Sequence, residues 1–262
     1  MWTEIVGWKH QAGRGKGRED MAETKNREGK VFSAWIGNFG TYAEGDLTGE
    51  WVDFPVSPEM LEGVLARIGG EKQMAFDYDI PEKYGFLHDI VSEYSGPEEL
   101  NLLGAMLEGL SRPELEAVEA YAESNGSMGL PELLNVVAQA DAIPYFPYKF
   151  DGMERAENIS AEEAYGYMAV ENGMPDLKSM LERYDLEDYL DYDAIGRDAN
   201  MSGSIQLCGN GYLNLAEEGP DLELYTVDEL KAEYGLAADP ESVQQEAVQA
   251  ADRHVDIKGP RV

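Results

Sequence analysis

Six carboxylate side chains lie close together in the stretch 177–203. They are Glu182, Asp185, Glu187, Asp188, Asp191 and Asp193. If 182–193 is a single helix, its length at about 1.5 Å per residue is roughly 18 Å, so one carboxylate falls about every 3 Å. One strand of B-DNA carries a phosphate about every 3.4 Å. The spacing indicates either a surface that imitates a polyanion or the solvated acidic face of an ordinary amphipathic helix.

The residues that bind metals are poorly represented. One cysteine, Cys208, and three scattered histidines do not make a zinc site of the usual composition. The pair Asp191 and Asp193 resembles the start of a calcium loop, but Ile195 and Ser202 occupy two positions where the loop needs oxygen ligands. We therefore expect no metal and no cofactor.

Nucleophilic catalysis has no better support. The chain contains no G-x-S-x-G elbow, and Cys208 falls inside a predicted hairpin. His88 is interpreted as a surface or core histidine. Paired carboxylates for acid–base work stay possible, but 52 Asp and Glu make chance pairs certain, so no single pair is informative. We expect no catalytic residues and a protein that is not an enzyme.

Charge is the dominant property of the composition. The 262 residues include 20 Lys and Arg against 52 Asp and Glu, for a net charge of −32. Such a chain repels nucleic acid and attracts basic partners in a salt-dependent way. Halophilic adaptation, simple solubility and a surface for a nucleic-acid-binding protein are the three interpretations. Residues 1–30 differ, because seven Lys and Arg against five acids make them a basic, flexible N-terminal arm.

The cellular compartment is predicted from the lack of a cysteine pair and of a long apolar segment. A single cysteine excludes an intramolecular disulfide and fits a reducing environment. No 18-residue apolar run is present, and the N-terminus lacks the apolar region of a secretory signal. We expect a cytoplasmic protein that binds no nucleic acid and no membrane.

The first folded part is predicted over 31–80 as a small antiparallel sheet with a helix. Strands are expected at 31–39, 47–56 and 72–80, where β-branched and aromatic residues gather. Ser57 followed by Pro58 is typical of a helix start, and Gly69 of its end.

A helical middle unit is predicted over 81–141, with a leucine stripe from Leu100 to Leu110, a capping box at Ser111–Glu114, and a short helix at 131–140.

The last folded part, 142–216, is predicted as a mixed α/β unit. Its two prolines predict an edge strand or an irregular strand at 142–150. A helix capped at Ser160 and a hairpin turning at Asn210-Gly211 follow. Residues 217–262 are predicted as an appended helical tail, with helices starting at Thr226 and at Asp239-Pro240.

Three segments, taken together, resemble the ArdA antirestriction family. The first is a strand followed by Tyr42, Gly45, Leu47, Gly49, Trp51 and Val52. The second is the acidic segment FDYDIPEKYG at 76–85, with Asp79 where the family has Glu. The third, YLDYDAIGRDANMSGS at 189–204, resembles the family's Asp-Tyr-x-x-Gly-Arg-Asp signature. Together they frame roughly 31–216.

The resemblance implies an α+β fold that is elongated, with three small units in a row. It implies a homodimer formed through the C-terminal unit. The implied partner is a type I restriction–modification enzyme, whose methyltransferase core is occupied where DNA should lie. The basic arm and the residues after 216 depart from the family pattern.

Under this hypothesis one set of acids forms the surface that mimics DNA: Asp77, Asp79, Glu82, Asp89, Glu93, Glu98, Glu99, Glu114, Glu116, Glu119, Glu154, Glu157, Glu162, Glu163, Glu182, Asp185, Glu187, Asp188, Asp191 and Asp193. Structural roles are expected for Arg197 and Asp198, as a local ion pair or a loop anchor. Tyr189, Tyr192 and Ile195 are expected in a core or a dimer seam. The alternatives are an acidic adaptor or chaperone for a basic nucleic-acid-binding protein, and an enzyme with a carboxylate site.

Overall fold

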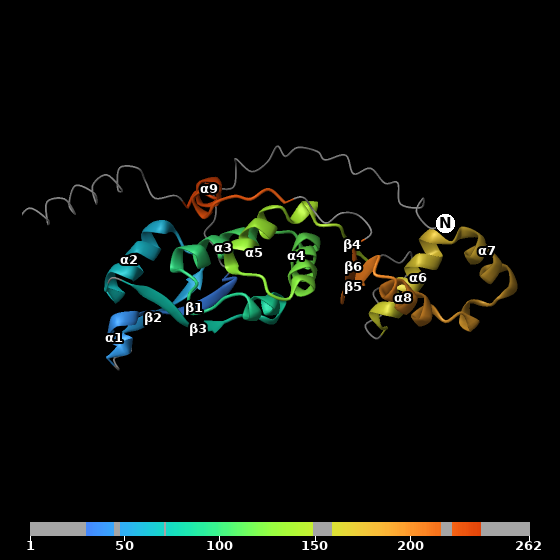
Figure 1. Cartoon of the computed structure of the whole chain (residues 1–262), viewed down its shortest axis with the longest axis horizontal. Helices are drawn as coiled ribbons and strands as arrows, with labels where there is room; N and C mark the ends of the chain where they lie inside the picture. Colours follow the sequence, from blue (N-terminus) through green and yellow to red (C-terminus); the bar gives the residue numbers. More distant parts are fainter. Residues whose placement is uncertain (1–29, 45–47, 71, 149–158, 216–221, 237–262) are drawn as a thin grey trace, which may run out of the picture. The chain divides into compact units, whose positions relative to one another are not determined.

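The computed structural model describes residues 30–44, 48–70, 72–148, 159–215 and 222–236 (Figure 1). These residues combine helices with two three-stranded antiparallel sheets, so the predicted α+β class is confirmed. They form two compact units. The first unit holds the described residues of 30–83, 91–108 and 225–236. The second unit holds those of 84–90, 109–148, 159–215 and 222–224. The elongated row of three units stays a prediction.

The first unit is built on the sheet β2-β1-β3, with β1 (Phe32–Asn38) between β2 (Gly49–Phe54) and β3 (Gln73–Asp79). All three strands were predicted from their β-branched and aromatic residues. The central strand turns an apolar side toward the core, where Phe32, Ala34 and Ile36 are 0% exposed. Side chains alternate between the two faces of a strand, so the intervening residues belong to the opposite face.

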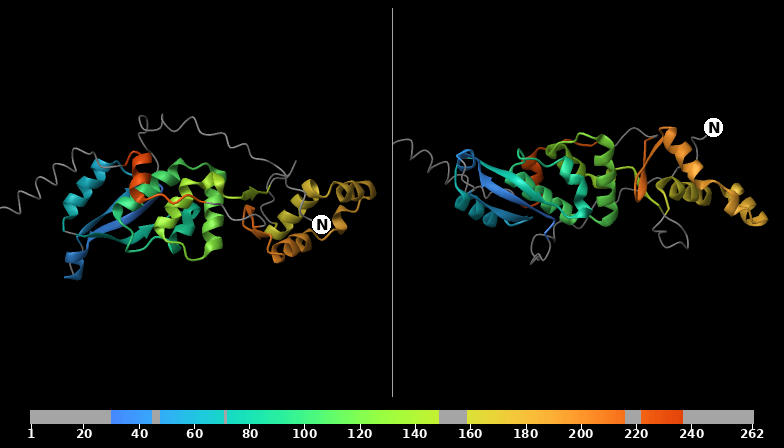
Figure 2. Two further views of the ribbon diagram at one scale, coloured as in Figure 1. Left: turned by 45° about the horizontal axis from the view of Figure 1, so that its top comes forward. Right: turned by 90° about the horizontal axis from the view of Figure 1, so that it is seen from below.

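Two helices follow the strands closely. A short helix, α1 (Phe39–Ala43), stands where the sequence analysis expected the end of a strand and a turn. It forms because the Asn38 side chain accepts a hydrogen bond from the Gly40 amide and caps it. The predicted helix α2 (Pro58–Ile68) is confirmed, with the Ser57 hydroxyl accepting from the Met60 amide. α2 contacts β1 and β2, and Figure 2 shows it beside the sheet.

Helices α3 (Pro97–Gly109) and α9 (Val227–Glu233) complete the first unit. Asn101 on α3 accepts from the Val56 amide and donates to the Val56 carbonyl, which joins the helix to the end of β2. On α9, Leu230 is 1% exposed, and Lys231 pairs with Glu98 of α3. The described tail residues 225–236 therefore pack as a part of this unit. The helix expected at Asp239-Pro240 lies outside the described residues.

The second unit begins with a 3₁₀ segment (Glu82–Asp89) that straddles the boundary, then α4 (Arg112–Asn125) and α5 (Leu130–Ala138). The capping box predicted at Ser111 is present, with the Glu114 carboxylate accepting from the Ser111 amide at 2.7 Å. The apolar core of this part is supplied largely by α5, where Leu133 and Leu134 are 0% exposed. A further 3₁₀ turn (Ala140–Ala142) leads to the second sheet.

The second sheet has the order β4-β6-β5, with β4 (Tyr145–Pro147), β5 (Ile205–Leu207) and β6 (Gly211–Asn214). β4 lies at an edge, as its prolines predicted. β5 and β6 form the predicted hairpin. Its turn comes before the predicted Asn210-Gly211 position, because Gly211 is already the first residue of β6 and its carbonyl accepts a hydrogen bond from the Cys208 amide.

The remaining helices of the second unit are α6 (Ala161–Met168), α7 (Pro175–Tyr184) and α8 (Tyr192–Met201). A π segment (Ala169–Gly173) continues α6, and a 3₁₀ turn (Glu187–Tyr189) lies between α7 and α8. α6 and α8 pack closely because Gly166 and Gly196 face the backbone of the opposite helix. Val170, Leu181 and Tyr192 form a small core cluster beside them.

Candidate functional site

Most of the acids that the sequence analysis assigned to a DNA-mimicking surface are accessible. Eleven are exposed: Asp77, Asp79, Glu82, Asp89, Glu93, Glu98, Glu182, Asp185, Glu187, Asp188 and Asp191. Seven are half-buried: Glu99, Glu114, Glu116, Glu119, Glu162, Glu163 and Asp193. The other two, Glu154 and Glu157, lie outside the described residues.

Among the described residues, the densest group of exposed carboxylates runs from the end of α7 to the start of α8. The single helix over 182–193 on which the even spacing depended is not formed, because α7 ends at Tyr184 and Asp185 adopts a left-handed conformation with φ of 56°. The even spacing of one carboxylate about every 3 Å is therefore not present. The carboxylates of this segment instead follow the end of one helix, a 3₁₀ turn and the start of the next.

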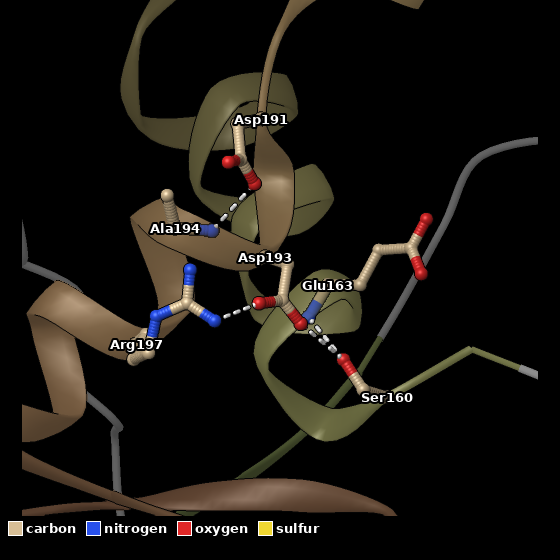
Figure 3. Close-up of polar contacts among 6 residues, drawn as sticks. All are labelled: Ser160, Glu163, Asp191, Asp193, Ala194 and Arg197. Carbon is tan, nitrogen blue, oxygen red and sulfur yellow. Dashed lines mark hydrogen bonds and ion pairs between the residues drawn. The ribbon is translucent and has the colours of Figure 1, made fainter.

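Several of these acids also have structural partners. Asp191 caps α8, because its side chain accepts from the Ala194 amide at 2.9 Å (Figure 3). Asp193 receives hydrogen bonds from Arg197, four residues along α8, and from the Ser160 hydroxyl that caps α6. Glu163 points its carboxylate away from this group in Figure 3. Asp193 is therefore part of the junction between α6 and α8.

Arg197 and Asp198, for which structural roles were expected, make different kinds of contact. Arg197 pairs with Asp193, while the carbonyl of Asp198 accepts a hydrogen bond from the Ser202 amide at the end of α8. Tyr192 is buried, stacks on Tyr167 with ring centroids 3.8 Å apart, and shares its cluster with Ile195. Tyr189 is 83% exposed, so it is not a core residue in this chain.

A second carboxylate group lines a pocket of about 150 Å³ in the second unit. Glu116, Glu119 and Glu123 on α4 face Tyr145 and Cys208. Burial, together with the negative charges of Glu123 and Glu116, raises the pKa of Glu119. Sequence reasoning missed Glu123, although its spacing from Glu116 and Glu119 would have placed the three on one face of a helix.

The chemistry of this pocket is limited. Burial, with a contribution from the nearby carboxylates, raises the pKa of the Cys208 thiol to about 11, so it stays protonated at neutral pH and is a poor nucleophile.

Within the described parts of the chain, no group of three or more His, Cys, Asp or Glu side chains has a geometry that could hold a metal ion. Among the same residues, no helix combines the length and apolar character needed to cross a membrane.

The fold and the composition place this chain among strongly acidic α+β proteins. A family model described as antirestriction protein (ArdA) matches residues 34–214, and the chain belongs to this family. The resemblance inferred from the three motifs is thereby confirmed, and with it antirestriction as the function that the family implies. A comparison with curated proteins found no match.

Proposed function

We propose that this protein is a non-catalytic inhibitor whose acidic surface mimics DNA. It competitively occupies the DNA-binding groove of a type I restriction–modification enzyme, at the methyltransferase core. It acts in the cytoplasm as a homodimer. The observation that carries the proposal is the group of five exposed carboxylates within ten residues, Glu182, Asp185, Glu187, Asp188 and Asp191, in a chain of net charge −32.

The charge balance around this group supports the proposal. Residues 159–215 contain eleven acids against Lys178, Arg183 and Arg197. Lys178 lies between Glu171 and Glu182, Arg183 lies over the ring of Tyr184, and Arg197 pairs with Asp193. Asp185, Glu187 and Asp188 are exposed, so a partner that carries Lys and Arg can reach them.

Competition with DNA follows from the physics of a DNA-binding groove. Such a groove gains much of its affinity from Lys and Arg contacts to phosphates, with release of counterions. Carboxylates held on a folded surface contact the same cations without presenting a base sequence. The inhibitor therefore suits enzymes of different sequence specificity, and its binding weakens as salt rises.

The first test is binding of the purified protein to a type I methyltransferase core, with and without cognate duplex DNA, over a salt series. We expect mutually exclusive binding that weakens steeply with salt. Simultaneous binding of the protein and the duplex would favour the acidic adaptor or chaperone over the mimic.

The second test separates local placement from total charge. The variant Glu182→Lys, Glu187→Lys, Asp188→Lys reverses three exposed carboxylates and leaves the helix cap Asp191 intact. We expect roughly 100-fold weaker binding, from about 1 kcal/mol for each reversed charge. The control Glu44→Lys, Glu62→Lys, Asp141→Lys changes the net charge equally at exposed positions outside the proposed surface. Equal losses in both variants would show that only bulk charge matters.

A further inference from the structure

The face of the first sheet opposite its apolar core carries two tryptophans and three aspartates. Residues that pair across antiparallel strands share a face, and Trp35 pairs with Trp51 on one side and Asp77 on the other. Ser33, two residues earlier, pairs with Asp53 and Asp79 in the same way. We call the group Trp35, Trp51, Asp53, Asp77 and Asp79 the open sheet face.

The open sheet face is accessible. Trp51 is 48% exposed, and the side chains of Asp53 and Asp79 are 68% and 64% exposed. The two indole rings lie edge to face, with centroids 6.1 Å apart and an interplanar angle of 70°. A Cβ at Gly49 would lie 2.5 Å from the Ile36 carbonyl oxygen and 2.9 Å from Trp35 Nε1, so a side chain there would clash with the neighbouring strand and with the indole. The surface thus presents large aromatic area beside carboxylates.

The chain itself shows that this face accepts a cation. Lys30 Nζ lies 2.6 Å from Asp79 Oδ2 and 3.9 Å from Asp53 Oδ1. Asp53 is held in place by a hydrogen bond from the Ser33 hydroxyl at 2.5 Å. One cation therefore bridges two of the carboxylates, while Trp51 and Asp77 lie beside this pair on the same face.

We infer that the open sheet face is a docking surface for arginine side chains of the target enzyme. The inference rests on the proposed function, because the partner is a surface that normally binds phosphates. Arginine fits better than lysine, since its planar guanidinium stacks on an indole and pairs with a carboxylate at the same time. Tryptophan and arginine are also the residues that dominate binding energy at protein interfaces. Trp51 therefore adds an uncharged contribution to an interaction otherwise driven by charge.

The test is the variant Trp51→Leu in the full-length protein, measured against the methyltransferase core over a salt series. We expect about 5- to 30-fold weaker binding at each salt concentration, from the loss of a partly desolvated cation–π contact. The slope of affinity against salt should not change, because no charge is removed. Trp51→Phe keeps an aromatic ring and should recover part of the affinity. The control Tyr94→Leu removes a ring that is 78% exposed in the same unit and should bind like the parent.

The outcomes separate this inference from the proposed function. If the parent competes with DNA and Trp51→Leu binds equally well, the open sheet face is not a docking surface and the mimic stands. If the parent does not compete with DNA, the proposed function is wrong, and the inference that rests on it is wrong with it. If Trp51→Leu changes the sedimentation of the free protein and leaves its affinity for the core unchanged, the face joins two copies of this chain and the inference is wrong. Thermal unfolding of each variant checks that the fold is retained.

Discussion

Glu119 shows how a single carboxylate of the acidic surface affects stability. It lies half-buried on α4 between Glu116 and Glu123, and its pKa is raised by burial and by these two charges. The folded protein therefore binds a proton at Glu119 more tightly than the unfolded chain does. The stabilising contribution of the protonated group is complete below the unfolded pKa and is lost as pH rises through the folded pKa. At neutral pH the ionised Glu119 opposes folding.

The corresponding prediction is that Glu119→Gln raises the thermal midpoint at pH 7. Glutamine keeps the size of the side chain and removes the charge. The gain over the parent should shrink toward zero near pH 4, where Glu119 is protonated in the folded protein and increasingly so in the unfolded chain. Thermal unfolding between pH 4 and pH 8, in about one-unit steps, measures it.

Glu62→Gln is the control for this prediction, because Glu62 is exposed on α2 in the other unit. We expect it to change stability by less than about 0.5 kcal/mol. A lower midpoint for Glu119→Gln at pH 7 would show that Glu119 makes a favourable interaction that outweighs its burial and the two neighbouring charges.

At the scale of elements, the packing of α6 against α8 depends on two glycines. A Cβ at Gly166 would lie 2.0 Å from the Tyr192 carbonyl oxygen, and one at Gly196 would lie 2.0 Å from the Glu162 carbonyl oxygen. Any side chain at either position forces the two helices apart. This contact holds Asp193 beside Ser160, so the same glycines position part of the acidic surface.

We therefore expect Gly166→Ala to lower the free energy of unfolding by about 2–4 kcal/mol, at or above the usual range for overpacking. Urea unfolding followed by circular dichroism measures this loss. Gly173→Ala is the matched control, because a Cβ there meets no atom within 4 Å. Equal effects of the two substitutions would show that α6 and α8 do not pack as closely as described.

At the scale of the whole molecule, the net charge of −32 has opposite effects on folding and on binding. Like charges repel one another in the folded state, and salt screens this repulsion. The thermal midpoint should therefore rise between about 0.02 and 0.5 M salt, as the Debye length falls from roughly 20 Å to about 4 Å. Over the same range the affinity for the target should fall.

The variant Glu44→Lys, Glu62→Lys, Asp141→Lys tests the cause of this salt effect. With a smaller net charge, it should gain less stability from salt than the parent does. A midpoint that is independent of salt in the parent would mean that ion pairs such as Glu98–Lys231 and Asp79–Lys30 offset the repulsion.

Local features of the fold were predictable because their hydrogen bonds span only a few residues. The caps at Ser57, Ser111 and Thr226 each join a side chain to an amide three residues later, and all three are present. The hairpin of β5 and β6 likewise follows from its turn residues. The break at Asp185 was missed because the residues on both sides of it have helical periodicity.

The physical reason for that break is a contact between residues distant in sequence. In one continuous helix Leu181 and Tyr192 would lie about 16 Å apart along the axis. In the folded chain both belong to one cluster with Val170, so the chain must reverse between them. Packing of apolar side chains outweighed the local preference for helix.

The sequence by itself determined the charge, the helix caps, the strands and the family, because each depends on composition or on neighbours along the chain. Only the tertiary structure decided which carboxylates are exposed, which of them join one helix to another, and that Trp35 and Trp51 meet beside Asp53, Asp77 and Asp79. These facts depend on strand register and on helix packing. Both are set by side chains that meet across the fold and are far apart in the sequence.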